Sequence, residues 1–191
     1  HAIKPGDTAL VHAGAGGVGL VLTQIIKHLG GKVISTVSTE EKAELARQAG
    51  ADEVFLYGQG VDVAATVRSL TDGEGVEVAY DGVGKDTFDA SLASLKPLGS
   101  LVLFGGASGQ VPPFDIQRLN SSGGIFLSRP SLVWMVATPE ALAKRWAMVS
   151  SGVEKGWLDF RIGETFPLAE AAEAHRALEG RKTTGKVVLR A

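Results

Sequence analysis

The sequence contains no cysteine among its 191 residues. The chain therefore forms no disulfide and offers neither a thiolate nucleophile nor a cysteine-ligated metal site. It also lacks a surplus of positive charge, since 19 lysine and arginine residues stand against 21 aspartate and glutamate residues. Charges of both signs are scattered along the chain, which argues against binding to a nucleic-acid backbone. We expect a cytoplasmic protein, because a chain without disulfides is typical of a reducing compartment.

Long hydrophobic runs are absent as well. The longest apolar stretch, residues 18–29, is interrupted by Gln24, Lys27 and His28, and no signal-peptide pattern opens the chain. We therefore expect no membrane span. The chain starts at His1 and enters its first apolar run a few residues later, so we expect it to be a piece of a longer protein. Its length suits one sizeable domain, or one domain and part of another.

Short apolar runs and helical patterns alternate through the first two thirds of the sequence. Strand-like runs lie at residues 8–12, 32–37, 53–56, 76–80, 100–104 and 125–127, and helical patterns lie at residues 18–29, 38–50, 63–70 and 86–95. In the second helical pattern, Ser38 and Glu41 have the spacing of a capping box, and Gly50 marks the end. This alternation predicts an α/β fold, with a parallel six-stranded sheet of the doubly wound Rossmann type.

The pattern changes after Pro130. A helical pattern at residues 139–151, an extended run at 159–166, a helix at 168–180 and a final strand at 185–190 do not continue the alternation. A small appendix to the first domain is one explanation. We favour another, in which residues 1–132 form a dinucleotide-binding domain and residues 133–191 are a C-terminal α+β segment of a second domain.

A glycine-rich turn follows the first predicted strand. Residues 11–19 read VHAGAGGVG, so Gly14, Gly16 and Gly19 match the pattern G-x-G-x-x-G between a predicted strand and a predicted helix. In such a unit the first glycine makes a tight turn, the second lets a diphosphate approach the backbone, and the third lets the helix pack closely. Unpaired N–H groups at the helix start then favour an anion. A turn that needs glycine for its shape alone is the alternative, and the missing G-K-[ST] argues against a triphosphate-binding loop.

The end of the second strand predicts the type of cofactor. A carboxylate at this place would bind the ribose 2′-hydroxyl, but the sequence has Ser38, followed one helical turn later by Lys42. A small hydroxyl and a cation favour the 2′-phosphate of NADPH over NADH. Two alternatives stay open: Ser38 is only a helix cap and Lys42 a solvated charge, or Glu40 or Glu41 turns toward the ribose.

The sequence also resembles a known family along nearly its whole length. The resemblance rests on the run from Leu10 to Tyr57, on "AYDGVGKDTFDASLASLKPLGSLVLFGGASG", on "RPSL", and on the closing "FPLAEAAEAH" and "GKVVL". These segments are similar to the quinone oxidoreductase (zeta-crystallin-like) branch of the medium-chain dehydrogenase/reductase superfamily. The similarity implies a cofactor-binding domain and a C-terminal segment, without the N-terminal catalytic domain. It also implies zinc-independent hydride transfer from NADPH to a small quinone or α,β-unsaturated carbonyl.

The resemblance further implies a set of cofactor contacts. Gly17 and Val18 would lie along the diphosphate, Ser38, Lys42 and Tyr57 around the 2′-phosphate, Gly82, Phe104, Gly105 and Gly106 at strand ends that face the cofactor, Leu127, Ser128 and Arg129 near the nicotinamide half, and Arg181 near the 2′-phosphate. Ordinary strand-end, turn and surface roles are the alternative for these residues. Since the catalytic domain would lie outside this chain, we assign no catalytic residue and expect the fragment to bind cofactor with little or no turnover.

Several other residues invite a functional interpretation but fit structural roles better. His12, His28 and His175 lack a second ligand at metal spacing, and Asp81 is not required for hydride transfer. We expect Trp134, Trp146 and Trp157 to pack in the C-terminal segment.

Other functions and the oligomeric state complete the sequence-based expectations. An enoyl-thioester reductase domain, a zinc alcohol dehydrogenase, a methyltransferase and a non-catalytic, crystallin-like nucleotide-binding protein are the alternatives. The apolar run Ile125–Leu127 would form an edge strand, so we expect a homodimer through this edge.

Overall fold

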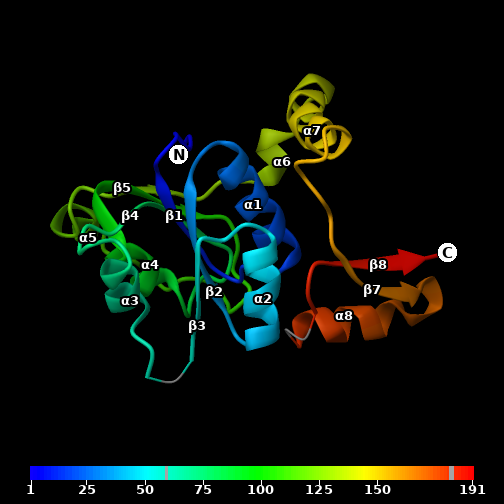
Figure 1. Ribbon diagram of the computed structural model, residues 1–191, viewed down its shortest axis with the longest axis horizontal. Helices are drawn as coiled ribbons and strands as arrows, with labels where there is room; N and C mark the ends of the chain where they lie inside the picture. The colour runs from blue at the N-terminus through cyan, green and yellow to red at the C-terminus, as the bar shows by residue number, and fades with distance from the viewer. Residues whose placement is uncertain (59, 181–182) are drawn as a thin grey trace.

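The computed structural model describes residues 1–58, 60–180 and 183–191 of the chain. Its main feature is a sheet of six parallel strands in the order β3-β2-β1-β4-β5-β6 (Figure 1). The strands are β1 (Thr8–Val11), β2 (Lys32–Val37), β3 (Glu53–Leu56), β4 (Val76–Asp81), β5 (Leu95–Leu103) and β6 (Phe126–Ser128). This order reverses direction between β1 and β4, which is the switch point of the doubly wound fold. The predicted fold class is therefore confirmed.

Helices cover both faces of the sheet. They are α1 (Gly17–His28), α2 (Glu40–Gln48), α3 (Val63–Ser69), α4 (Phe88–Ala93) and the short α5 (Gln117–Ser121). Neighbouring strand residues alternate between two cores: Leu10 packs in the cluster with Phe88 and Leu92 of α4, whereas Ala9 and Val11 pack with residues of α1 and α2. Burial of both faces explains why the strands read as continuous apolar runs.

The C-terminal part of the chain contains a separate two-stranded sheet. The elements of this part are α6 (Leu132–Met135), α7 (Pro139–Glu154), β7 (Ile162–Pro167), a 3₁₀ turn (Leu168–Glu170), α8 (Ala171–Glu179) and β8 (Lys186–Arg190). β7 and β8 pair in parallel and α8 connects them, as in a βαβ unit. This unit lies beside α1 and α2, while α6 and α7 project away from the sheet (Figure 1).

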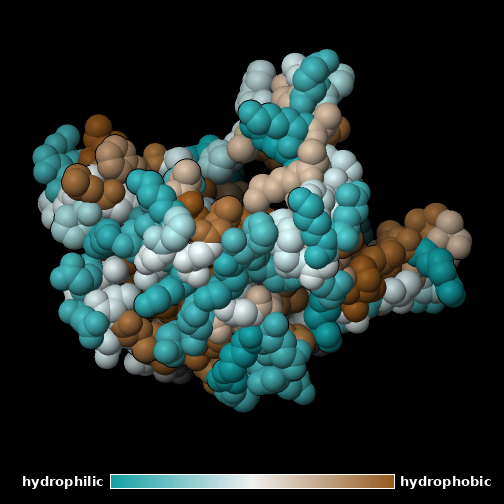
Figure 2. Space-filling model, turned by 45° about the horizontal axis from the view of Figure 1, so that its top comes forward, coloured by the Kyte–Doolittle hydropathy of each residue, from teal (hydrophilic) through white to brown (hydrophobic). Residues whose placement is uncertain are grey.

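Apolar side chains remain exposed on these C-terminal elements. Figure 2 shows hydrophobic residues along the arm formed by β7, β8 and α8, where Ile162, Leu168 and Leu189 are exposed. Trp134 is 82% exposed and Trp146 is 60% exposed, so the predicted packing of these two side chains is wrong within this chain. Trp157 does pack, because its ring stacks on His28 with 3.8 Å between the ring centroids.

Some predicted boundaries shift by a few residues. Thr39, not Ser38, caps α2, because the Thr39 hydroxyl accepts the backbone N–H of Lys42 at 3.3 Å. α4 is shorter than the pattern at residues 86–95, since Leu95 already pairs with Val76 in the sheet. Within the described parts of the chain, no helix is both long enough and apolar enough to cross a membrane.

Candidate functional site

The glycine-rich turn joins β1 to α1 at the carboxyl edge of the sheet. Its left-handed residue is Ala13, with φ of +52°, and not the first glycine. Gly14 is needed for another reason, because a Cβ there would lie 1.7 Å from the Ser35 hydroxyl oxygen of β2. Gly19 is needed for close packing, since its Cβ would lie 2.4 Å from the Ala13 carbonyl oxygen. The turn therefore packs against β2 at Gly14 and against α1 at Gly19, with no room for a side chain at either position.

The start of α1 suits an anion. Gly16 is the N-cap residue, no side chain of the described residues caps the helix, and the first turn contains no acidic residue. The first N–H groups of a helix carry a partial positive charge and need acceptors from outside the helix. Val18, in this first turn, is 53% exposed. A negatively charged group of a ligand would satisfy these donors.

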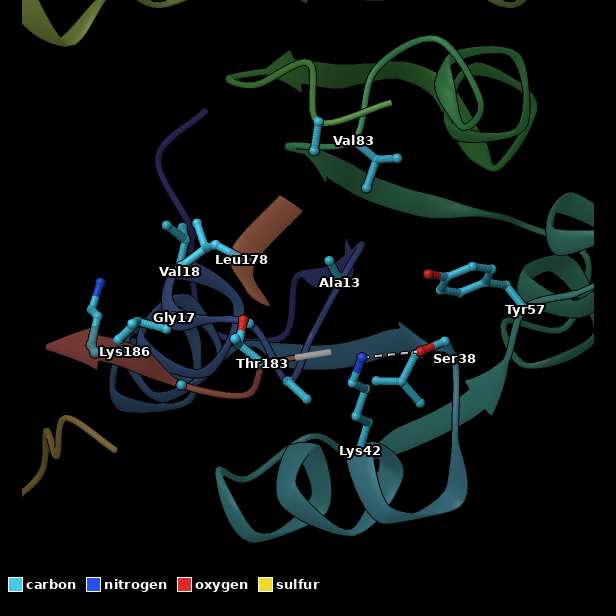
Figure 3. A pocket seen from close by; sticks show the side chains of 16 residues that line it. Ala13, Gly17, Val18, Ser38, Lys42, Tyr57, Val83, Leu178, Thr183 and Lys186 are labelled. Carbon is cyan, nitrogen blue, oxygen red and sulfur yellow. Dashed lines mark hydrogen bonds between the residues drawn. The ribbon is translucent and has the colours of Figure 1, made fainter. Parts of the chain in front are cut away.

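A cavity of about 450 Å³ opens at this helix start (Figure 3). It is lined by Ala13, Ala15, Gly16, Gly17, Val18, Val37, Ser38, Lys42, Tyr57, Val83, Ala107, Leu178, Thr183, Gly185, Lys186 and Val187. Its size falls within the range of small-molecule and cofactor sites. Among these described lining residues there are two lysines and no carboxylate, so the cavity favours a negatively charged ligand.

Ser38 and Lys42 come together at one side of the cavity. The Lys42 ammonium donates a hydrogen bond to the Ser38 hydroxyl at 3.3 Å (Figure 3). Because Thr39 caps α2, the Ser38 side chain is not needed as the cap and faces the cavity instead. Glu40 turns away along the helix, where its carboxylate pairs with Arg47 at 2.7 Å. The tip of β2 therefore presents a hydroxyl and a cation together.

The C-terminal segment supplies the opposite wall. Gly185 donates a backbone hydrogen bond to the Ala15 carbonyl at 3.0 Å and forms an isolated parallel bridge with Gly16. A Cβ on Gly17 would lie 2.8 Å from the Gly185 carbonyl oxygen. Leu178 and Val18 both line the cavity at this wall (Figure 3). Residues about 170 positions apart thus build one cavity.

A second cavity of about 380 Å³ adjoins the first, and Ala13, Tyr57 and Val83 line both. Its further lining residues are His12, Thr36, Gly58, Val61, Asp62, Val63, Asp86, Thr87 and Ala90. Tyr57 is 39% exposed and stands between the two cavities. A ligand longer than either cavity can therefore run from one into the other along the carboxyl ends of β1 and β4.

A buried polar chain lies beneath the second cavity. Ser91 donates its hydroxyl to the Asp81 carboxylate at 2.7 Å, and its oxygen is 2.9 Å from Nε2 of His12. Since the hydroxyl proton is used on Asp81, Nε2 of His12 must be the protonated nitrogen, and Nδ1 accepts the Thr36 hydroxyl at 2.9 Å. Burial lowers the pKa of His12 and outweighs the opposing attraction of Asp81. His12 is therefore a neutral structural histidine, as the sequence predicted.

Asp81 fixes the segment that reaches the cavities. Its carboxylate accepts the backbone N–H groups of Val83 and Gly84 at 2.8 and 2.9 Å, and the Thr87 hydroxyl at 2.8 Å. These bonds hold the turn after β4, so Val83 lines both cavities. The role of Asp81 is structural in this arrangement.

The structure brings together six of the residues predicted as cofactor contacts. The cavity wall contains Gly16, Gly17, Val18, Ser38, Lys42 and Tyr57. Gly14 and Gly19 do not line the cavity, but they allow the close packing of the turn against Ser35 and of α1 against Ala13. The other described candidates, namely Gly82, Phe104, Gly105, Gly106, Leu127, Ser128 and Arg129, line neither of these two cavities. Arg181 lies outside the described residues, so these assignments stay predictions.

The glycines after β4 and β5 have a visible packing role. A Cβ on Gly105 would lie 2.3 Å from the Gly82 carbonyl oxygen, and a Cβ on Gly82 would lie 2.7 Å from the Phe104 ring. The two chain segments cross at these positions. Val83 and Ala107, each a residue or two further along, reach the first cavity instead.

Sequence reasoning missed the cavity residues of the C-terminal segment. Leu178, Thr183, Gly185, Lys186 and Val187 line the wall, yet they follow the turn by more than 150 residues. The available signal was Gly185 as the first residue of the last predicted strand, since glycine in a strand permits close approach of another backbone.

No metal centre emerges from the part of the chain that the structure describes. These residues contain no group of three or more histidine, cysteine, aspartate or glutamate side chains placed to hold an ion. The donor set that a protein zinc site requires is thus not found among residues 1–58, 60–180 and 183–191.

The fold and the glycine-rich turn define a Rossmann-type domain with an anion-favouring cavity at its switch point. The sequence profile of the family described as zinc-binding dehydrogenases matches residues 17–136. This chain belongs to that family.

Individual relatives show which members of this family the chain resembles in sequence. The chain is 45% identical over 187 residues to a quinone oxidoreductase of Pseudomonas aeruginosa, covering 98% of this chain and 57% of the relative. It is 42% identical over 190 residues to a 2-haloacrylate reductase of a Burkholderia species, covering 99% of this chain and 57% of the relative. The predicted resemblance to the quinone oxidoreductase branch is therefore confirmed, and the chain spans little more than half the length of these relatives.

Solved structures agree with the sequence relatives. A mycobacterial protein in complex with NADPH is 53% identical, with a TM-score of 0.96 over 100% of this chain and 59% of that chain. The quinone oxidoreductase of Escherichia coli in complex with NADPH is 37% identical, with a TM-score of 0.94 over 100% of this chain and 59% of that chain.

Proposed function

We propose that this chain binds NADPH across the two adjoining cavities and forms the cofactor-binding part of a quinone oxidoreductase-like enzyme. The observation that carries the proposal is the pairing of an uncapped helix start at Gly16 with the Ser38–Lys42 hydrogen bond in one cavity. The two anionic parts of NADPH, its diphosphate and its 2′-phosphate, match these two features.

The diphosphate would lie on the start of α1. Gly17 and Val18 offer the backbone N–H groups of the first turn of α1, whereas the Gly16 N–H already donates to the Ala13 carbonyl at 2.9 Å. The helix dipole favours negative charge at this end. The wall at Gly185 would limit how far the ligand extends over Gly17, because their backbones are already in close contact.

The 2′-phosphate would lie on Ser38 and Lys42. A hydroxyl and an ammonium supply one neutral and one charge-assisted hydrogen bond, and a carboxylate that would repel the phosphate is missing from the described cavity lining. Glu40 is held by Arg47. Tyr57 supplies a ring between the two cavities, beside which the adenine would lie.

The proposed reaction is reduction of a quinone or an α,β-unsaturated carbonyl without zinc. When bound, NADPH supplies the hydride, and the protein positions it and excludes water. We assign no catalytic residue to this chain, and we propose that the 191 residues alone bind cofactor with little turnover. An enoyl-thioester reductase and a crystallin-like role without catalysis use the same cofactor site, and acyl-thioester binding or absence of turnover in the full-length protein would distinguish them.

The remaining parts of the proposal concern organisation. We propose that residues 1–132 are the cofactor-binding domain, that residues 133–191 belong with a catalytic domain, and that the protein is cytoplasmic. We also propose a homodimer through the β6 edge. Phe126 is 64% exposed on this edge, whereas Ile125 packs in the core, so Phe126 and the β6 backbone would make the contact. Light scattering of a clean monomer at high concentration would count against the dimer.

Calorimetric titration with NADPH and with NADH tests the proposed function. Selective binding of NADPH is expected, because only NADPH carries the group that Lys42 and Ser38 would bind. Equal affinities would overturn the assignment of the 2′-phosphate site, and binding of neither nucleotide would overturn the proposed function of this chain.

A further inference from the structure

Gln24, in the middle of α1, holds the backbone of a distant residue from both sides. The Asp159 N–H donates to Oε1 of Gln24 at 2.7 Å, and Nε2 of Gln24 donates to the Asp159 carbonyl at 3.0 Å. The same amide nitrogen also donates to the Leu20 carbonyl at 3.1 Å, which fixes the orientation of the amide. A side-chain amide can donate and accept in this paired way without a charge at any ordinary pH, whereas a carboxyl group can do so only when it is protonated.

The residues next to Asp159 hold the wall of the cofactor cavity. The Arg161 carbonyl accepts the Lys186 backbone N–H at 2.8 Å. A Cβ on Gly185 would lie 2.4 Å from the same carbonyl oxygen, so the two backbones are packed without a gap. Gly185 in turn donates to the Ala15 carbonyl at 3.0 Å. Gln24 is therefore linked to the wall that faces Gly16 and Gly17 in two steps: along the chain from Asp159 to Arg161, and through the hydrogen bond from Lys186 to Arg161.

Gln24 itself does not line the cofactor cavity. It lines a separate, polar hollow on the other side of the C-terminal connection, together with Gln48 and Arg161. The nearby stacking of His28 on Trp157 is a second attachment of this segment to α1, at the far end of the helix. Because Asp159 is exposed, water can satisfy its backbone groups when the Gln24 amide is removed. Loss of Gln24 should therefore loosen the position of the wall more than it lowers the stability of the fold.

We propose that Gln24 is a positioning residue for cofactor binding. By holding Asp159 it fixes Arg161, and Arg161 fixes the start of β8 against the glycine-rich turn. This inference rests on the proposed function, since its measurable consequence is the affinity for NADPH.

Gln24→Leu tests the inference, with Gln48→Leu as the matched control. Leucine keeps the approximate size of the side chain and removes both hydrogen bonds to Asp159, together with the one to the Leu20 carbonyl. Gln48 lines the same hollow, but its amide bonds only within α2, to Glu44 at 3.0 Å. We expect the Kd for NADPH to rise roughly five- to twentyfold in Gln24→Leu, which corresponds to the loss of one or two hydrogen bonds, and to stay unchanged in Gln48→Leu.

Hydrogen exchange separates a loosened wall from a destabilised fold. In Gln24→Leu the amides of Asp159, Gly185 and Lys186 should exchange faster, while those of β1 and β2 keep the protection of the unaltered chain. Faster exchange throughout the six-stranded sheet would overturn the inference, because a general loss of stability would then explain the weaker binding.

Gln24→Glu provides a rescue experiment. Its carboxylate still accepts the Asp159 N–H but sets a second oxygen against the Asp159 carbonyl, and protonation restores the missing donor. The affinity for NADP⁺ relative to the unaltered chain should recover as the pH is lowered from about 8 to about 4, through the ordinary glutamate pKa of about 4.3. A ratio that does not change with pH would contradict the role of the paired hydrogen bonds. If the unaltered chain does not bind NADPH, the proposed function fails with the inference; equal affinities of the unaltered chain and Gln24→Leu overturn the inference alone.

Discussion

Gly185 donates its backbone N–H to the carbonyl of Ala15 at 3.0 Å, which joins the loop before the last strand to the glycine-rich turn after the first. The cavity is consequently built by both ends of the chain. Ser38, Lys42 and Tyr57 stand on the Rossmann side, and Gly185 and its neighbours stand on the other.

Lys42→Ala should weaken binding of NADPH and leave binding of NADH nearly unchanged. A hydrogen bond to a charged partner contributes about 1.5–3 kcal/mol, so the Kd for NADPH should rise about 10- to 100-fold. Lys27→Ala is the control, since Lys27 pairs with Asp52 at 2.7 Å and lines neither cavity. Calorimetric titration measures both variants, and an equal loss of NADPH and NADH affinity would refute the assignment.

Gly19→Ala should destabilise the fold by about 1–3 kcal/mol, the usual cost of overpacking. The added Cβ would lie 2.4 Å from the Ala13 carbonyl oxygen and 2.7 Å from the Gly14 backbone, and backbone atoms cannot rotate away. Gly58→Ala is the control, because nothing lies within 4 Å of its Cβ position. Urea unfolding of the two variants checks the difference; equal midpoints would show that Gly19 is not needed for packing.

Asp81→Asn should also destabilise the fold, since an amide can accept with only one oxygen and its NH₂ would face the N–H or O–H donors that Asp81 now accepts. We expect a loss of at least about 1.5–3 kcal/mol, the contribution of one hydrogen bond to a charged group. The exposed Asp89, which pairs with Arg118 at 2.6 Å, supplies the control variant Asp89→Asn. Similar unfolding midpoints for both variants would contradict a structural role of Asp81.

The stability of the fold should fall as the pH drops below about 6.5, the ordinary pKa of histidine. Burial lowers the pKa of His12 in the folded state, so the unfolded chain takes up a proton at a higher pH than the folded chain does. This protonation stabilises the unfolded chain and lowers the free energy of unfolding. The His12 contribution is complete above this pH and is lost as the pH falls toward the lowered pKa.

His12→Gln should reduce this dependence on pH, because glutamine does not titrate. Urea unfolding of the variant and of the unaltered chain between about pH 8 and about pH 5 gives the two slopes. Identical slopes would mean that His12 does not carry the effect.

Much of the fold was predictable because its signals are local. Apolar runs, glycine stops and the spacing of Gly14, Gly16 and Gly19 are all read within short windows of sequence. The sequence also indicates Ser38 and Lys42 as a site for the 2′-phosphate at the end of the second strand. In the structure, Nζ of Lys42 lies 3.3 Å from the Ser38 hydroxyl oxygen at the cavity.

The features that the sequence did not predict correctly depend on which of two neighbouring residues takes a role, or on contacts between residues far apart in the sequence. Ser38 and Thr39 both suit a helix cap, and only the structure shows that Thr39 takes the role. The left-handed turn residue is Ala13 rather than a glycine, and Gly14 is required instead by its close approach to Ser35 of β2. The wall at Gly185 and the Gln24–Asp159 pair join positions more than 130 residues apart, and no pattern in a single sequence encodes such contacts.

A crystal structure of this chain with NADPH tests the central claim most directly. The account predicts the diphosphate on the backbone N–H groups of Gly17 and Val18, and the 2′-phosphate within hydrogen-bonding distance of Lys42 and Ser38. A nucleotide bound outside this cavity, or one whose 2′-phosphate points away from Lys42, would contradict it.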